Sequence, residues 1–94
     1  MLKSNGVLTT LVLNDNDIRD EGAVALAHGL SHNRALELLE LNGCAIKAEG
    51  AKALGRALET NDVLTKVDLR NNRLGDDGVL EIGRSLLNSA LLAF

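Results

Sequence analysis

The chain has 94 residues, a formal net charge of −3 and one cysteine. This acidic balance leaves no basic surface to match a phosphate backbone, so no nucleic acid partner is expected. One cysteine cannot form an internal disulfide, and the sequence shows neither an apolar signal region nor an apolar run of the roughly 20 residues that span a bilayer. We therefore expect a cytoplasmic protein with no membrane partner.

The first predicted elements lie in residues 8–35. Leu11 and Leu13 occupy alternate positions, which is typical of a short strand with one buried face. Over residues 22–30 the apolar residues recur at helical spacing and leave His28 on the outer side. This segment is therefore predicted to form a strand, a turn and a helix, in that order.

The same pattern returns twice, so the chain is predicted to hold three copies of a 28-residue repeat. Since strand, turn and helix follow one another in every copy, the strands are expected to lie parallel, with the helices on the outer face. Each repeat of such a solenoid packs only on its neighbours, so residues 1–94 are treated as one segment of a larger leucine-rich repeat protein. The full repeats are 8–35, 36–63 and 64–91, with partial repeats at 1–7 and 92–94.

Polar residues recur at both ends of the predicted helices. The carboxylates Asp20 and Glu21 precede the first helix, where they can cap its first turn and complement its dipole, and Glu49 takes the same place in the second repeat. Asn33 and Asn61 follow the helices, where a left-handed turn is expected because asparagine tolerates that conformation. These residues are predicted to be structural.

A separate column of polar residues, made of Asn16, Cys44 and Asn72, follows the strands. The backbone turns inward there, and its buried polar groups need hydrogen-bond partners. Asparagine and cysteine both have short side chains with a donor, so they can supply those partners from inside the turn. A reactive thiol is the alternative for Cys44, but a buried cysteine without a cationic neighbour is usually inert. We therefore predict a structural role for this Asn/Cys column.

Each repeat follows the pattern L-x-x-L-x-L-x-x-(N/C)-x-(I/L), continued by a glycine, two apolar positions and a further polar residue. This pattern resembles the ribonuclease-inhibitor-like class of leucine-rich repeats, which includes ribonuclease inhibitor, the sensor domains of NOD-like receptors and the activating protein of the small GTPase Ran. The phrase at Asp20–Ala23 is most similar to NOD-like receptors, whereas the many cysteines of ribonuclease inhibitor and the acidic tail of Ran activators are missing. The resemblance implies an α/β solenoid, a horseshoe segment with a parallel sheet on its concave face and helices on its convex face.

Three short motifs imitate other sites. Residues 78–85 resemble a phosphate-binding loop with arginine in place of lysine, but they align with the helices of the other repeats, so a helix is predicted. Residues 15–20 loosely match a calcium loop, although Arg19 occupies a ligand position. His28 and His32 could supply two zinc ligands, and no third ligand is evident nearby. We therefore predict no catalytic residues, no metal and no cofactor.

The concave face is predicted to carry the residues of each strand and following turn that are not leucines of the repeat pattern. Their types vary between repeats, so folding does not dictate them, and an extended sheet of this kind is typical of a macromolecule-binding surface. For any single residue, a solvated position is the alternative. Glu40, Asp68 and Arg70 carry the charges expected to select a partner. The concave-face residues are Thr10, Val12, Asn14, Asp15, Leu38, Glu40, Asn42, Lys66, Asp68, Arg70 and Asn71.

The leading hypothesis is a non-enzymatic scaffold that binds a protein partner through the concave face. One alternative, implied by the resemblance alone, is regulation of a small GTPase, as by a GTPase-activating protein. Another is a structural or self-associating segment, because the end repeats lack the polar caps that solenoids normally carry. The apolar residues expected to be exposed at these ends are Leu2, Val7, Leu8, Leu86, Leu91, Leu92 and Phe94.

Overall fold

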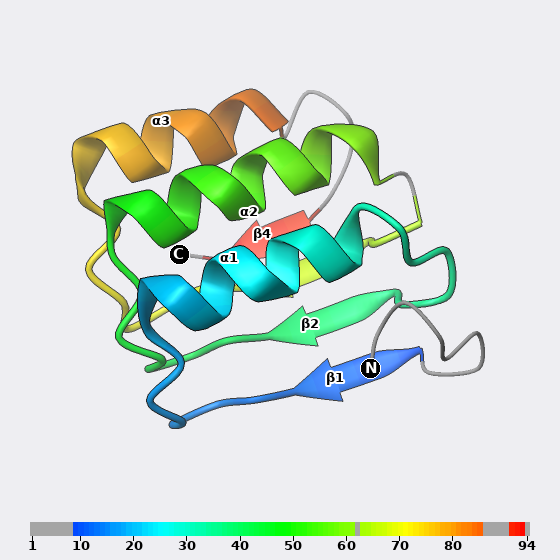
Figure 1. The fold of residues 1–94 in the computed structure, drawn as a ribbon, viewed down its shortest axis with the longest axis horizontal. Coiled ribbons are helices and arrows are strands. Elements are labelled where there is room, and N and C mark those ends of the chain that lie inside the picture. Colours follow the sequence, from blue (N-terminus) through cyan, green and yellow to red (C-terminus); the bar gives the residue numbers. More distant parts are fainter. Residues whose placement is uncertain (1–8, 62, 86–90, 94) are drawn as a thin grey trace.

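The structure is a computed structural model that describes residues 9–61, 63–85 and 91–93. In these ranges short strands alternate with helices along the chain (Figure 1). The strands pair in parallel in the order β1-β2-β3-β4, so neighbours in the sequence are also neighbours in the sheet. The elements are β1 (Thr10–Val12), α1 (Arg19–Leu30), β2 (Leu38–Glu40), α2 (Ala48–Thr60), β3 (Lys66–Asp68), α3 (Gly75–Ser85) and β4 (Leu91–Ala93).

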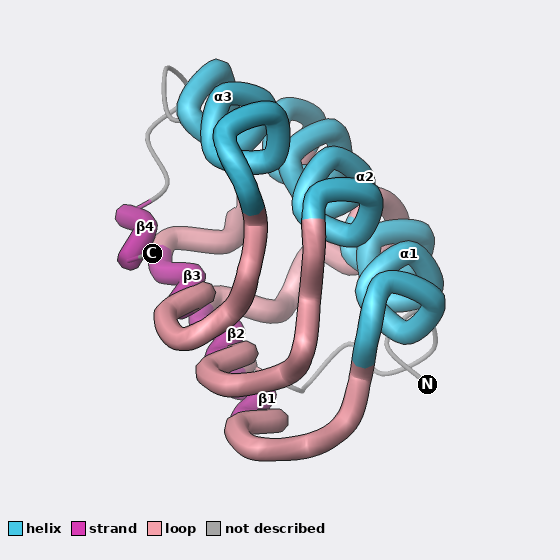
Figure 2. Tube along the Cα trace, turned by 90° about the vertical axis from the view of Figure 1, so that its left-hand side faces the viewer, coloured by secondary structure: helices cyan, strands magenta, loops and turns pink. Residues whose placement is uncertain are grey.

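The three helices form one layer and the strands form another (Figure 2). Each turn of the coil runs along a strand, through a loop and back along a helix that covers the same face of the sheet. Contacts between helices join α1 to α2 and α2 to α3. The predicted α/β solenoid is therefore confirmed, with the sheet on its concave face and the helices on its convex face.

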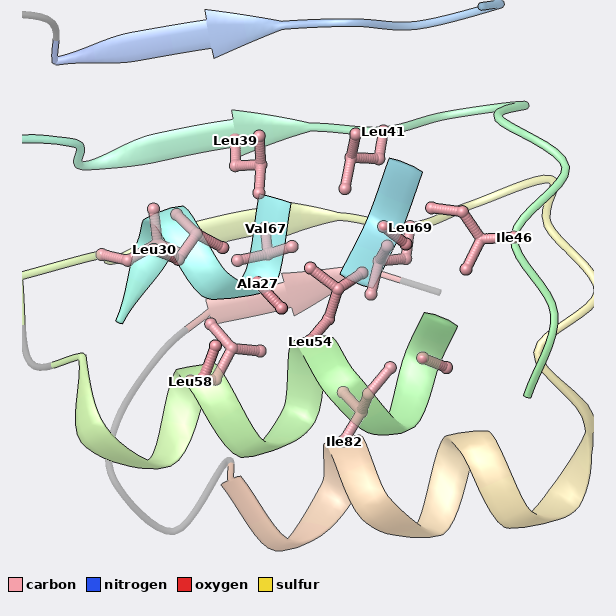
Figure 3. Close-up of a cluster of buried hydrophobic side chains, with 14 of the residues drawn as sticks. Ala27, Leu30, Leu39, Leu41, Ile46, Leu54, Leu58, Val67, Leu69 and Ile82 are labelled. Carbon is pink, nitrogen blue, oxygen red and sulfur yellow. The ribbon is translucent and has the colours of Figure 1, made fainter. Parts of the chain in front are cut away.

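Aliphatic side chains fill the space between the two layers (Figure 3). Leu39 and Val67 point from the sheet toward the helices, while Leu54 and Leu58 of α2 approach from the opposite side. These four side chains are at most 2% exposed. Burying one such side chain stabilises a fold by about 1.5–3 kcal/mol relative to leaving it in water. The leucine positions of the repeat are therefore the ones that hold the layers together.

Small residues let the helices approach closely. A Cβ atom added at Gly50 would lie only 2.8 Å from the Cβ atom of Ala23 on α1. At Gly78, the equivalent atom would lie 2.9 Å from the Cβ atom of Ala51 on α2. The recurring glycine therefore marks the place where each helix contacts the preceding one.

The left-handed conformation expected at Asn33 and Asn61 is wrong. Asn61 has φ −94° and ψ 110°, and Asn33 is not among the residues with positive φ. Both asparagines are buried and act through their side chains. Asn33 Oδ1 accepts a hydrogen bond from the backbone N–H of Leu36 at 2.7 Å, and Asn61 Oδ1 accepts one from the backbone N–H of Leu64 at 2.8 Å. Because the amides close these turns, no left-handed residue is required.

Left-handed backbone occurs instead in the turn after each strand. Asp15, Gly43 and Asn71 have φ values of 61°, 66° and 61°, and they occupy the same position in successive repeats. Glycine adopts this region freely, and asparagine and aspartate adopt it more readily than most residues. The shape of the turn therefore helps to determine the residue types in this column.

The acidic residues at the helix starts lie in the first turns, as expected, but Asp20 does not cap its own helix. The N-cap residues of α1 and α2 are Ile18 and Lys47, and neither forms a side-chain capping hydrogen bond. Asp20 Oδ1 instead accepts a hydrogen bond from the backbone N–H of Lys47 at 2.7 Å. The capping prediction for Asp20 is wrong because its carboxylate reaches the next repeat and joins the starts of two helices.

The fourth strand departs from the repeat spacing. Leu38 pairs with Lys66, 28 residues later, whereas Lys66 pairs with Leu91, only 25 residues later. The predicted partial repeat at 1–7, and the apolar ends at Leu2, Val7, Leu8, Leu86 and Phe94, lie outside the described residues.

Candidate binding face of the sheet

The side of the sheet that faces away from the helices carries the concave-face residues in straight columns. Thr10 pairs with Leu38, which pairs in turn with Lys66. The next column begins at Val12, which pairs with Glu40. Thr10 and Lys66 are exposed, and Val12 is 53% exposed, although it is apolar. The face therefore offers an apolar position beside charged and hydroxyl groups.

Polar side chains of the concave face are joined by hydrogen bonds across the repeats. Asn14 Nδ2 donates to Glu40 Oε1 at 2.7 Å, and Asn14 Oδ1 accepts from the backbone N–H of Asn42 at 2.8 Å. Asn71 Nδ2 donates to Asn42 Oδ1 at 2.8 Å. These bonds hold the four side chains in fixed positions before any partner binds. Such preorganisation lowers the entropic cost of association.

Asp68 differs from the other charged residues of this face because it is only 5% exposed. Its carboxylate accepts hydrogen bonds from Arg70 Nε at 3.1 Å, from Arg70 Nη2 at 2.9 Å and from the backbone N–H of Arg70 at 3.0 Å. The guanidinium group holds the pKa of Asp68 below its usual value. Asp68 therefore positions the exposed side chain of Arg70 and offers little free charge to a partner.

Asn72 connects the second and third repeats from inside the turn. Its Nδ2 atom donates to the carbonyls of Leu41, Leu69 and Arg70 at 2.8, 3.0 and 3.3 Å. Its Oδ1 atom accepts from the backbone N–H groups of Cys44 and Ile46 at 2.9 and 3.0 Å. One side chain thus supplies partners to backbone groups of both repeats.

Cys44 supplies fewer contacts at the equivalent position. Its Sγ atom donates to the carbonyl of Leu13 in the first repeat at 3.1 Å. Burial raises the pKa of the Cys44 thiol, which favours the protonated form over the nucleophilic thiolate. Asn16, in the first repeat, donates to the carbonyls of Leu13 and Asn14 at 2.9 and 3.3 Å, within its own turn.

The motifs that imitate other sites have ordinary places in the fold. Residues 78–85 lie within α3, as the helix interpretation predicted. The rings of His28 and His32 are 5.1 Å apart at the exposed end of α1. Across the described ranges, no group of three or more His, Cys, Asp or Glu side chains is arranged to hold a metal ion. In the same ranges, every helix is too short or too polar to cross a bilayer.

A hollow of about 250 Å³ beside this face is lined in part by Lys47 and Arg73, which the predicted columns do not include. The two residues occupy different positions of the repeat, so the repeated pattern gives no signal that they meet. The only available signal is that each is a basic residue in a turn that leads to a helix.

Comparison with known sequences places the chain in a family. A sequence profile described as "Leucine Rich repeat" matches residues 4–27, 32–55 and 60–83. The three matches begin 28 residues apart and together cover most of the chain. The chain therefore belongs to the leucine-rich repeat family. No curated protein sequence matches it significantly.

Two solved structures share this fold. The actin-binding site 2 of leiomodin-1 superposes with a TM-score of 0.89 and 29% sequence identity, over 98% of this chain and 56% of that one. The C-terminal domain of tropomodulin from Caenorhabditis elegans superposes with a TM-score of 0.82 and 20% identity, over 93% of this chain and 53% of that one. The chain thus spans about half the length of these two structures.

We expect the Asn/Cys column to differ in its contribution to stability from repeat to repeat. Asn72→Ala removes the partners of buried backbone groups in two repeats and should lower the free energy of unfolding by roughly 3 kcal/mol. Asn16→Ala is the matched control, because Asn16 is exposed and bonds only within its own turn, and it should cost under about 1 kcal/mol. Urea unfolding followed by circular dichroism measures both. Equal losses would contradict the bridging role of Asn72.

The contribution of Asp68 to stability should depend on pH. Asp68→Asn removes the charge that Arg70 binds and should lower the free energy of unfolding by about 1 kcal/mol at neutral pH, because solvent weakens a pair whose guanidinium is exposed. The folded pKa of Asp68 lies below the unfolded one. The contribution is therefore complete above about pH 4 and is lost as the pH falls through the folded pKa.

Urea unfolding of the wild type and Asp68→Asn over a series of pH values provides the measurement. The difference between the two proteins should shrink in acid. A difference that stays constant down to the lowest pH would mean that the Asp68 charge does not stabilise the fold.

Proposed function

We propose that this chain is a non-enzymatic scaffold that binds a protein partner through its concave face. The observation that carries the proposal is the set of cross-repeat hydrogen bonds among Glu40, Asn14, Asn42 and Asn71. They fix polar groups on an accessible surface that the leucine core does not require. Membership of the leucine-rich repeat family supports the same conclusion.

The chemistry of the face describes the partner. Val12 is an exposed apolar residue at the end of β1, and covering such a residue with a protein surface removes apolar area from water. Glu40 pairs with Val12 on the neighbouring strand, and Arg70 follows the next strand. Their opposite charges favour a partner with complementary charges and a defined orientation. We therefore infer a partner surface with an apolar contact opposite Val12 and charged groups that complement Glu40 and Arg70.

Matched substitutions on the two faces test this proposal. Val12 is 53% exposed on the sheet and Val24 is 49% exposed on α1, so Val12→Asp and Val24→Asp make the same change on opposite faces. Glu40→Arg and Glu49→Arg form a second matched pair. The concave variants should reduce binding about tenfold or more, because Val12→Asp places a charge against an apolar surface and Glu40→Arg places a positive charge against a surface that complements a negative one.

Each immobilised variant is exposed to the same cell lysate, and the retained proteins are quantified against the wild type by mass spectrometry. Melting curves show that all variants are folded. Val24→Asp and Glu49→Arg should retain the same proteins as the wild type. Equal retention by the concave variants would refute binding through this face.

Actin is a specific candidate partner. The structure of leiomodin-1 that superposes with a TM-score of 0.89 is described as an actin-binding site, and the match covers 98% of this chain. Since that chain is about twice as long, the proposal holds only if the matched half is sufficient for binding.

Binding to monomeric actin is measured by fluorescence anisotropy, with the leiomodin-1 segment as the positive control. The wild-type chain should bind, Val12→Asp should weaken binding about tenfold, and Val24→Asp should not. The proposal fails if the chain does not bind at concentrations that saturate the leiomodin-1 segment. Regulation of a small GTPase, self-association through the ends and cytoplasmic location stay predictions from the sequence.

A further inference from the structure

Three hollows follow one another along the edge where the strands turn into the helices. Their volumes are about 330, 250 and 300 Å³. Ala45 and Lys47 line both the first and the second hollow, while Asn71, Asn72 and Arg73 line both the second and the third. Because neighbouring hollows share lining residues, they lie in one row across the three repeats, which we call the turn groove.

The middle of the turn groove is its most positive part. Lys47 and Arg73 line the second hollow, and none of its lining residues is acidic. The first hollow includes the carboxylates of Asp20 and Glu21, and the third includes that of Asp76. Positive charge is therefore concentrated in the central hollow, whereas carboxylates offset the positive charges in the hollows on either side.

The two cations of the central hollow are available. Both side chains are exposed, and neither forms an ion pair with any residue that the structure describes. Arg19 in the first hollow behaves differently, because its Nη2 atom lies 2.7 Å from Asp17 Oδ2. An anion that enters the central hollow thus has no internal carboxylate to displace.

Hydrogen bonds fix the backbone on both sides of the central hollow. The N–H of Arg73 donates to the carbonyl of Ile46 at 2.9 Å, and the N–H of Lys47 donates to Asp20 Oδ1 at 2.7 Å. Ala45 and Asn71 are held in left-handed conformations, with φ of 59° and 61°. A left-handed alanine is unfavourable, and such residues persist only where the surrounding structure determines the backbone.

We propose that the central hollow receives the carboxylate of an aspartate or glutamate in a segment of the partner protein that crosses the turn groove. The inference rests on the proposed scaffold function, because Asn71 belongs both to the concave face and to the hollow. A partner on the sheet therefore reaches the hollow without leaving the surface. The acidic residues of the flanking hollows disfavour a doubly charged phosphate, so a single carboxylate is the better fit.

A blocked tetraglutamate peptide is the probe, and the blocked tetraglutamine peptide is its uncharged control. Amide chemical shifts of the chain are followed by NMR during each titration. The acidic peptide should shift the signals of residues 45–47 and 71–73, and the control peptide should not. In the Lys47→Ala and Arg73→Ala double variant, the apparent affinity should fall about tenfold or more.

Arg56→Ala removes an exposed cation from the convex side of α2 and should leave the titration unchanged. The proposal is overturned if the shifts spread over other residues, if the double variant binds as the wild type does, or if a phosphoserine peptide binds more tightly than the acidic one. The peptide titration does not involve Glu40, which is the residue varied in the test of the scaffold function. Failure of the hollow is therefore distinguishable from failure of the scaffold function, which the concave variants test separately.

Discussion

Hydrogen bonds at the ends of the strands, where the backbone leaves the sheet, hold consecutive repeats in one register. Burial of leucine is non-directional and would favour many compact arrangements of this aliphatic chain. Asn72 selects one of them, because its amide bonds to backbone groups of two repeats at once. An unpaired buried backbone group costs about 1–3 kcal/mol, so a shifted register would be strongly disfavoured. This constraint therefore helps to align the columns of the concave face between the second and third repeats.

The repeat pattern is sufficient to predict the fold, because apolar spacing is a local signal for strands and helices. Contacts between repeats are harder to predict from it. The carboxylate of Asp20 is expected to cap its own helix but binds the backbone of the next repeat. The amide of Asn33 stays within its own turn, where it takes the place of the expected left-handed residue. A residue type that recurs in every repeat indicates that its side chain is required. Several backbone groups could serve as its hydrogen-bond partner, so the sequence does not identify that partner.

The candidate site shows the same limit. The columns of the face follow from strand pairing, but the burial of Asp68 does not, since it depends on how Arg70 folds back over the carboxylate. The turn groove was not predictable, because Lys47 and Arg73 lie at different positions of the repeat. They line one hollow between the second and third repeats, beside Ala45, which takes a left-handed conformation. One irregular turn in a regular array thus creates a surface that the repeat does not encode.

Position 44 has a cysteine where the other two repeats have an asparagine, so the hydrogen bonds between repeats differ along the solenoid. Asn72 has a side-chain oxygen that accepts two N–H groups of the second repeat, whereas the thiol of Cys44 donates to the carbonyl of Leu13 in the first repeat and sulfur is only a weak acceptor. Within this column the first two repeats are therefore joined by fewer hydrogen bonds than the next two, so their joint depends more on the side chains of Asn14 and Asp20.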